Sequence, residues 1–301
     1  MKVFVTGAAG YIGSSIAVHL KQSGHDVTGL VRSDEQAAAL REHGIVPVVG
    51  TLDDRALLIE HVRAADGVVN AASSDHRGAV EALIEGLAGS DKPLLHTSGS
   101  SLVGDNSKGE GTDAIFQEDG LPAPTPDKAA RVAIDTLVLD AAKRGVRSAV
   151  LCNTLIYGHS LGLPRESVQL PRLIRQAQKS GVMRHVGRGA NIWSNVHIRD
   201  VVELYRLALE RTPAGTFYFV ESGEAAFADM AHALARQLGL GQSHDWPIEA
   251  AIEEWGYEMA SYGLGSNSRV RGQRAHNLLG WKPGAPDVFA WIEAEIPAEA
   301  H

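Results

Sequence analysis

The first turn of the chain places the strongest constraint on how it folds. A short strand-like run, KVFVTG, is followed by TGAAGYIG and then by a segment whose apolar residues recur at helical spacing. Glycines in such a turn let the backbone approach a phosphate closely, and the free amides at the helix start bind it. This context predicts a dinucleotide-binding turn, and a tight turn without a ligand is the alternative. The residues expected to form it are Gly7, Ala9, Gly10, Tyr11, Ile12 and Gly13.

Strands and helices alternate regularly through the first half of the chain. Further strand patterns occur at DVTGLV, VPVVG, GVVNAA, PLLHTSG and RSAVLCNTLIYG, and most of the segments between them have helical periodicity. Short apolar strands separated by helices predict a parallel sheet that is covered on both faces. The expected fold class is therefore α/β, with a Rossmann-type doubly wound parallel sheet.

The chain changes character after Gly158, where longer helical segments mix with short strands such as GTFYFV. This pattern indicates a smaller mixed α/β domain that binds the substrate. We expect a dinucleotide-binding domain at residues 1–157, to which a segment at about 190–214 returns. The substrate-binding domain is expected at residues 158–189 and 215–301.

Composition and charge narrow the classes of partner. Hydrophobic residues make up 44% and charged residues 21% of the chain, as in ordinary globular proteins. The formal net charge of -8 argues against a nucleic-acid partner, because a phosphate backbone binds clustered lysine and arginine. The single cysteine, Cys152, excludes an internal disulfide and a multi-thiolate metal site, so we expect a reducing cytoplasm and no metal. No apolar run reaches the length of about 18 residues that a membrane span needs.

The end of the second strand chooses between the two nicotinamide dinucleotides. An NAD site carries an acid here for the ribose hydroxyls, whereas this chain reads GLVRSDE, with Arg32 and Ser33 first. Arg32 can form a forked contact with a 2′-phosphate, and Ser33 adds a hydroxyl. NADP is therefore the expected cofactor. The alternative is a solvated Arg32 with Asp34 on the ribose of NAD. Leu52 and Ala71 are expected to line the same site.

Several short motifs spread over the chain form a recognisable set, namely TGAAGYIG, VVNAA, HTSGSSLVGD, LCNTLIYG, NVHIRDVV and LLGWKP. With these motifs the chain resembles the extended short-chain dehydrogenase/reductase family, which contains nucleotide-sugar epimerases and dehydratases. The catalytic Tyr-x-x-x-Lys pair of that family has no counterpart here. In one register Asp127 stands at the tyrosine position and Arg131 at the lysine position, and in a shifted register Pro124 and Lys128 take these positions. Gly99 stands at the position of the family's serine. The resemblance therefore points to an atypical branch that keeps the fold and the cofactor site.

Other residues are candidates for the proton transfer and for binding the substrate. Tyr157 ends the sixth strand, where ligands gather at the carboxyl ends of parallel strands, and a pocket wall is the alternative. Ser98 and Ser100 follow the fifth strand and can bond a substrate oxygen or cap the turn. Lys128 is a partial substitute for the family lysine if it is buried, whereas Arg131 orients a substrate but keeps its proton.

The segment TPDKAARVAID predicts a helix that begins at Thr125 and runs through about Lys143. Asp127 is expected in its first turn as a charged carboxylate that forms an i,i+4 pair with Arg131. The helix is apolar on almost every side, so one face is expected on the sheet and the other on a second subunit. This predicts a homodimer, and burial beneath the second domain is the alternative.

Together these features predict an NADP-dependent oxidoreductase that acts by hydride transfer on a small organic substrate. The alternative from a different class is a non-catalytic protein that binds NADP(H) and senses redox state or acts as a scaffold. A nucleotide-sugar epimerase or dehydratase is a weaker third possibility, because the family tyrosine is absent.

Overall fold

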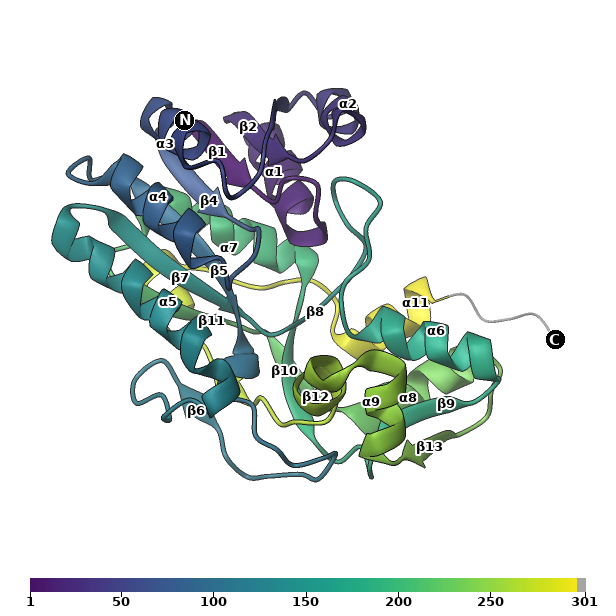
Figure 1. The fold of residues 1–301 in the computed structure, drawn as a ribbon. Coiled ribbons are helices and arrows are strands. Elements are labelled where there is room, and N and C mark those ends of the chain that lie inside the picture. The colour runs from purple at the N-terminus through teal and green to yellow at the C-terminus, as the bar shows by residue number, and fades with distance from the viewer. Residues whose placement is uncertain (297–301) are drawn as a thin grey trace.

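A parallel sheet of seven strands forms the larger part of the computed structural model, which describes residues 1–296 (Figure 1). The expected α/β fold with a Rossmann-type sheet is confirmed. In spatial order the strands are β11 (Thr216–Val220), β7 (Arg147–Asn153), β5 (Pro93–Gly99), β4 (Gly67–Asn70), β1 (Lys2–Thr6), β2 (Asp26–Val31) and β3 (Val46–Val49).

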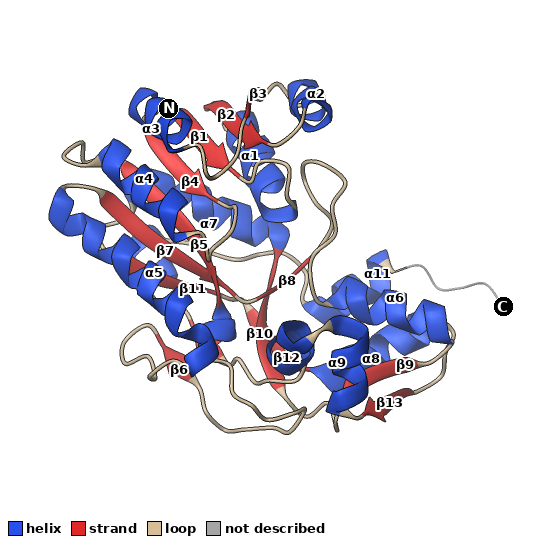
Figure 2. Ribbon diagram, in the orientation of Figure 1, coloured by secondary structure: helices blue, strands red, loops and turns tan. Residues whose placement is uncertain are grey.

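Helices cover both faces of this sheet (Figure 2). Successive residues of a strand point to opposite faces, so Val3 and Val5 of β1 join one buried cluster and Phe4 joins the other. The first cluster is completed by α1 (Tyr11–Gln22), α2 (Asp34–Glu42), α7 (Ile198–Arg211) and α10 (Arg274–Leu279). The second is completed by α3 (Arg55–Ala64), α4 (Arg77–Leu87) and α5 (Ala129–Asp140). Within the described chain, none of the helices is long and apolar enough to cross a membrane.

A smaller part lies beside the carboxyl end of the sheet and has its own buried cluster. Its central sheet has the order β12 (Gly223–Ala226), β10 (Ile192–His197) and β8 (Leu155–Tyr157). Two shorter pairs are β13 (Ser243–Trp246) with β9 (Met183–Val186), and β14 (Val270–Arg271) with β6 (Phe116–Gln117). Its helices are α6 (Leu170–Ser180), α8 (Phe227–Gln237), α9 (Ile248–Trp255), a π-helical turn (Met259–Leu264) and α11 (Val288–Glu295).

The chain returns to the large sheet later than the sequence pattern suggests. We expected GTFYFV in the substrate domain, but it forms β11, which pairs in parallel with β7 as the seventh strand. All five residues of β11 are buried. A strand this short carries no signal in its sequence that shows which sheet it joins. The run RSAVLCNTLIYG, expected as one strand, divides at Thr154 into β7 of the large sheet and β8 of the small one. The chain therefore passes from the larger part to the smaller part directly at the end of β7.

The helix expected from Thr125 begins with a 3-10 turn, Pro126–Lys128, before α5 proper. Thr125 makes no side-chain capping bond there. On the outer face of α5, Ala130, Ala133 and Thr136 are exposed, so the second domain does not cover this face. The alternative, burial of this face beneath the second domain, therefore does not hold for α5. The homodimer stays a prediction.

The turn between β1 and α1 has no room for a side chain at Gly7 or at Gly13. Gly7 has a left-handed φ of +67°, and a Cβ on it would lie 2.5 Å from the carbonyl oxygen of Ala71. A Cβ on Gly13 would lie 2.1 Å from the carbonyl oxygen of Gly7. The turn is thus packed between the end of β4 and the first turn of α1, which explains the glycine spacing.

We predict that Gly7→Ala destabilises the protein more than Gly24→Ala. Gly24 also has a positive φ, +86°, but no atom lies within 4 Å of the place that a Cβ would take, so only backbone strain of about 1–2 kcal/mol is expected. The collision at Gly7 should add about 1–3 kcal/mol to the loss in the free energy of unfolding. Urea unfolding of both variants measures the difference. Equal losses in the free energy of unfolding would show that the turn can adjust to a side chain at Gly7.

Candidate functional site

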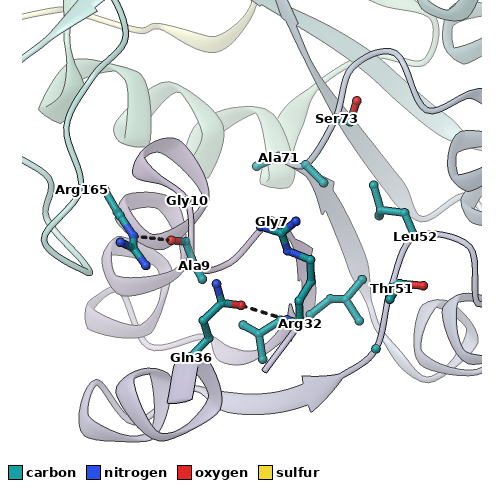
Figure 3. A pocket seen from close by; sticks show the side chains of 14 residues that line it. Gly7, Ala9, Gly10, Arg32, Gln36, Thr51, Leu52, Ala71, Ser73 and Arg165 are labelled. Carbon is teal, nitrogen blue, oxygen red and sulfur yellow. Dashed lines mark hydrogen bonds between the residues drawn. The ribbon is translucent and has the colours of Figure 1, made fainter. Parts of the chain in front are cut away.

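A cavity of about 600 Å³ lies over the β1–α1 turn, where the carboxyl ends of four strands meet (Figure 3). Gly7 follows β1, Arg32 follows β2, Thr51 follows β3 and Ala71 follows β4. Most of the expected cofactor residues face this cavity. The full lining is Gly7, Ala9, Gly10, Leu30, Val31, Arg32, Gln36, Gly50, Thr51, Leu52, Ala71, Ala72, Ser73 and Arg165.

The start of α1 offers unpaired amides to the cavity. Its N-cap residue, Gly10, has no side chain to cap the helix, and the first N–H groups of a helix have no acceptor within it. These groups and the helix dipole attract an anion. The N–H of Gly10 itself donates to the carbonyl of Gly7 at 2.9 Å, which holds the turn closed. The geometry fits a dinucleotide diphosphate.

The charges around the cavity are all positive. Arg32 and Arg165 line it, and no carboxylate does, although the protein has a net charge of -8. The main-chain N–H of Arg32 donates to Oε1 of Gln36 at 2.9 Å, and among residues 1–296 its guanidinium forms no ion pair. Arg165 lies across the glycine turn from Arg32 (Figure 3). A cavity with this charge pattern binds anions.

The other expected residues near the cofactor have structural roles. Ser33 is the N-cap of α2 and accepts from the N–H of Gln36 at 3.3 Å, outside the lining of the cavity. Asp34 follows in the first turn of α2, exposed and also outside the lining, so the alternative contact with a ribose finds no support. Gly13 packs against Gly7.

A second cavity of about 310 Å³ adjoins the first and shares Gly10 and Ala71 with it. It lies at the ends of β5 and β7, against the loop that leads into α6. Tyr11 and Ile12 line it, and the Tyr11 hydroxyl donates to the carbonyl of Gly158 at 2.8 Å. Its remaining lining is Ser98, Gly99, Asn153, Thr154, Ile156, Ser167, Val168 and Gln169. Polar groups therefore converge on a space next to the dinucleotide cavity.

Ser98 connects the second cavity to a chain of buried polar groups. Its hydroxyl donates to Oδ2 of Asp135 at 2.7 Å, and Oδ1 of Asp135 lies 3.6 Å from Nε2 of His96. Nδ1 of His96 lies 2.9 Å from the amide nitrogen of Asn70, whose oxygen accepts from the Thr6 hydroxyl at 2.5 Å. All of these side chains are less than one-tenth exposed.

The hydrogen bonds of this network fix where its protons lie. Because the Asn70 oxygen accepts from Thr6, its amide donates to Nδ1 of His96, and a neutral His96 carries its proton on Nε2, towards Asp135. Burial lowers the pKa of His96 to about 4, so the ring is neutral. Burial raises the pKa of Asp135 to about 7. When Asp135 is protonated on Oδ2, it donates to Ser98, whose own proton then turns to the cavity.

Two further candidates lie away from both cavities. Ser100 is fully buried and its hydroxyl lies 2.8 Å from that of Ser268. Lys128 is 2% exposed, pairs with Glu258 and lies 4.0 Å from the centre of the Tyr262 ring. Lys128 meets the condition of being buried, but its ammonium is held between Glu258 and the Tyr262 ring and lies outside the lining of both cavities.

The expected pair between Asp127 and Arg131 does not form, which corrects our interpretation of this segment. Arg131 makes a forked pair with Asp75, with nitrogen–oxygen distances of 2.8 and 2.6 Å. Asp127 accepts instead from the hydroxyls of Tyr262 at 2.8 Å and Tyr257 at 3.2 Å. Both partners come from distant segments, so local spacing does not reveal them.

Tyr157 lies in the core of the smaller part and lines neither cavity. It is 2% exposed, and its hydroxyl donates to the carbonyl of Pro286 at 2.8 Å. Its ring packs edge-on against His197, with ring centres 5.3 Å apart. A hydroxyl held this way is badly placed to protonate a substrate. Because Tyr157 lines neither cavity, the pocket-wall alternative does not describe it either, and it is a core residue of the smaller part.

Sequence reasoning missed two groups of site residues. Arg165 stands in a loop that matches no motif, so nothing in the sequence marks it. Asp135, His96 and Asn70 carry a weak signal, because they are polar residues inside apolar runs. Burying such residues is costly unless they are hydrogen-bonded, and the structure shows a partner for Nδ1 of His96 and for Oδ2 of Asp135.

Comparison with known proteins gives consistent matches. The model of the NAD dependent epimerase/dehydratase family matches residues 3–220. The chain is 34% identical to "Oxidase ucsJ" from Acremonium sp, over 99% of this chain and 97% of that protein. It is 28% identical to the 4-hydroxy-2-methyl-3-oxo-4-farnesyl-3,4-dihydroquinoline-1-oxide ketoreductase from Stigmatella aurantiaca, over 74% and 69%. Its fold is similar to that of dTDP-glucose 4,6-dehydratase from Bacillus anthracis in complex with NAD, with a TM-score of 0.76, 18% identity and 98% and 97% coverage.

We predict that Asp135→Asn changes how stability depends on pH. Burial raises the pKa of Asp135 from 3.8 to about 7, so between these values the folded protein holds a proton that the unfolded chain releases. The free energy of unfolding of the wild type should therefore fall relative to the variant by up to about 1.4 kcal/mol per pH unit as the pH rises through this window.

Urea unfolding of both proteins at several pH values between 4 and 8 tests this prediction. His96, whose lowered pKa has the opposite effect, and the nearby pair of Arg131 and Asp75 are present in both proteins. Their contributions largely cancel in the difference. Parallel stability curves would mean that Asp135 is charged in the folded protein.

Proposed function

Because this chain belongs to the NAD dependent epimerase/dehydratase family, we propose that it is an NADP-dependent oxidoreductase that reduces a carbonyl group of a small organic molecule. Membership in this family and its reductase relatives make it an NAD(P)-dependent enzyme, which also confirms the resemblance to extended short-chain dehydrogenases/reductases. The observation that carries the finer proposal is the dinucleotide cavity, lined by two arginines and by no carboxylate.

The preference for NADP rests on Arg32. It follows β2 directly, at the place where an NAD site has an acid for the ribose hydroxyls. Its guanidinium is exposed at the cavity and forms no ion pair within residues 1–296, so it is available for a 2′-phosphate. Gln36 holds the Arg32 main chain at the end of β2.

The class of substrate is inferred from the second cavity and from the relatives. The names of two relatives include "Oxidase" and "ketoreductase", and a third is named a 2-alkyl-3-oxoalkanoate reductase. The cavity of about 310 Å³ is small and is lined by both polar and apolar residues. It suits a compact ketone or quinone. A nucleotide-sugar reaction is less well supported, since the family's Tyr-x-x-x-Lys pair is absent.

Residues at the second cavity would supply the proton that a carbonyl reduction needs. When bound, NADPH supplies the hydride. Ser98 lines the cavity, and in this reaction its hydroxyl gives its proton to the oxygen of the substrate. Asp135, protonated on Oδ2, then returns a proton to Ser98 along the 2.7 Å hydrogen bond. His96 lies beside Asp135, with Nε2 3.6 Å from Oδ1, and stays neutral because burial lowers its pKa to about 4.

We predict that the protein binds NADPH more tightly than NADH and that Arg32→Ala removes this difference. The lost contact is a charge-assisted hydrogen bond, so NADPH affinity should fall by about 10- to 100-fold while NADH affinity is unchanged. Isothermal titration calorimetry measures both ligands. Arg41→Ala, which removes an exposed positive charge elsewhere on α2, is the matched control. Equal binding of both cofactors by the wild type would contradict the NADP assignment.

We predict that Ser98→Ala lowers the rate of NADPH oxidation by about 10²- to 10⁴-fold, the usual contribution of a general acid. The assay follows NADPH absorbance with a panel of ketones and quinones, and NADPH affinity is measured on the same samples. Ser23→Ala, an exposed serine after α1, is the control. An unchanged rate would remove Ser98 from the mechanism. NADPH binding by the wild type without turnover of any compound would favour the alternative of a redox sensor.

A further inference from the structure

The loop between β8 and α6 crosses the first turns of α1 as a strap, which we define as residues 159–169. Its main-chain N–H groups at Leu161 and Leu163 donate to the hydroxyls of Ser15 and Ser14, at 3.1 and 3.2 Å. A Cβ on Gly162 would lie 2.5 Å from the carbonyl oxygen of Ser14, so strap and helix are in close contact. Both serines are fully buried. They hold the strap where α1 begins.

The strap carries one positive charge to the glycine turn. Arg165 is exposed, lines the dinucleotide cavity, and its Nε donates to the carbonyl of Ala9 at 3.2 Å. The acid next to it, Glu166, pairs with Arg175 instead. Within residues 1–296 no carboxylate pairs with Arg165, and no hydrogen bond engages its two terminal nitrogens.

We propose that Arg165 binds the diphosphate of the dinucleotide and that the strap thereby clamps the cofactor against the start of α1. This inference rests on the proposed function. The bond to Ala9 fixes the guanidinium directly beside the turn whose amides and helix dipole attract the same anion. A guanidinium binds phosphate oxygens through parallel N–H groups, which suits the two nitrogens that remain.

The two arginines then recognise different parts of one ligand. Arg32 lies at the end of β2 and meets the 2′-phosphate, which NADP has and NAD lacks. Arg165 lies at the other side of the glycine turn and meets the diphosphate, which both cofactors have (Figure 3). Arg32 therefore decides which cofactor binds, and Arg165 sets how tightly either one is held. The strap also connects this contact to the substrate cavity, because Ser167 and Gln169 line that cavity.

The test compares three ligands by isothermal titration calorimetry with the full chain. The ligands are NADPH, NADH and adenosine 2′-monophosphate, which has the 2′-phosphate but no diphosphate. Arg165→Gln removes the charge and retains an amide donor for the Ala9 carbonyl. Arg199→Gln removes an exposed positive charge at the start of α7, away from the strap, and is the matched control, and Arg32→Ala is the complementary variant.

We expect Arg165→Gln to weaken both NADPH and NADH by about 10- to 100-fold and to leave adenosine 2′-monophosphate unchanged. Arg32→Ala should show the opposite pattern, with NADPH and adenosine 2′-monophosphate weakened and NADH unchanged. The affinity of the wild type for NADH should also fall more steeply with salt than that of Arg165→Gln.

If Arg165→Gln binds both dinucleotides as tightly as the wild type does, the inference is overturned and the proposed function stands. Equal weakening of all three ligands would also overturn it, because it would show that Arg165 only maintains the shape of the cavity. A wild type that binds neither dinucleotide would overturn the proposed function, and the inference with it.

Discussion

The close packing of the β1–α1 turn against the end of β4 is the contact on which the rest of the site depends. Because Gly7 and Gly13 have no side chains, the turn brings backbone amides to the edge of the sheet. An uncapped helix start then faces a cavity that Arg32 and Arg165 make positive. The strap is held on the same helix by Ser14 and Ser15, so its position follows from the turn as well.

At the start of α5, the residues at the positions of the family's catalytic pair form contacts with other parts of the protein. At its exposed end, Asp127 is bound by tyrosines of the smaller part, and Arg131 is neutralised by Asp75. Asp135, one turn further on, is enclosed by the sheet. A carboxyl group in such surroundings keeps its proton near neutral pH, since burial penalises the charged form. In the proposed function this carboxyl group lies behind Ser98 and returns a proton to it along their 2.7 Å hydrogen bond.

The parts of the fold that were predictable share one property, which is that their signal is local. The strand, glycine turn and helix at the N-terminus are contiguous in sequence, and so are β2 and Arg32. The same reasoning failed for GTFYFV, because the length of a strand does not show which sheet it joins. It also failed for Asp127 and Arg131, whose i,i+4 spacing is real but whose partners come from segments far along the chain.

The sequence by itself determined the α/β fold, the dinucleotide turn and the residue that follows β2, because backbone periodicity and glycine spacing act between near neighbours. Only the tertiary structure decided which polar side chains meet at the two cavities. Arg165 comes from a loop 156 residues after Ala9, whose carbonyl it binds. Asp135, His96 and Asn70 come from three separate elements. Their contacts depend on how the strands are ordered in the sheet and on which buried polar atoms must find a partner, and neither is encoded in local spacing.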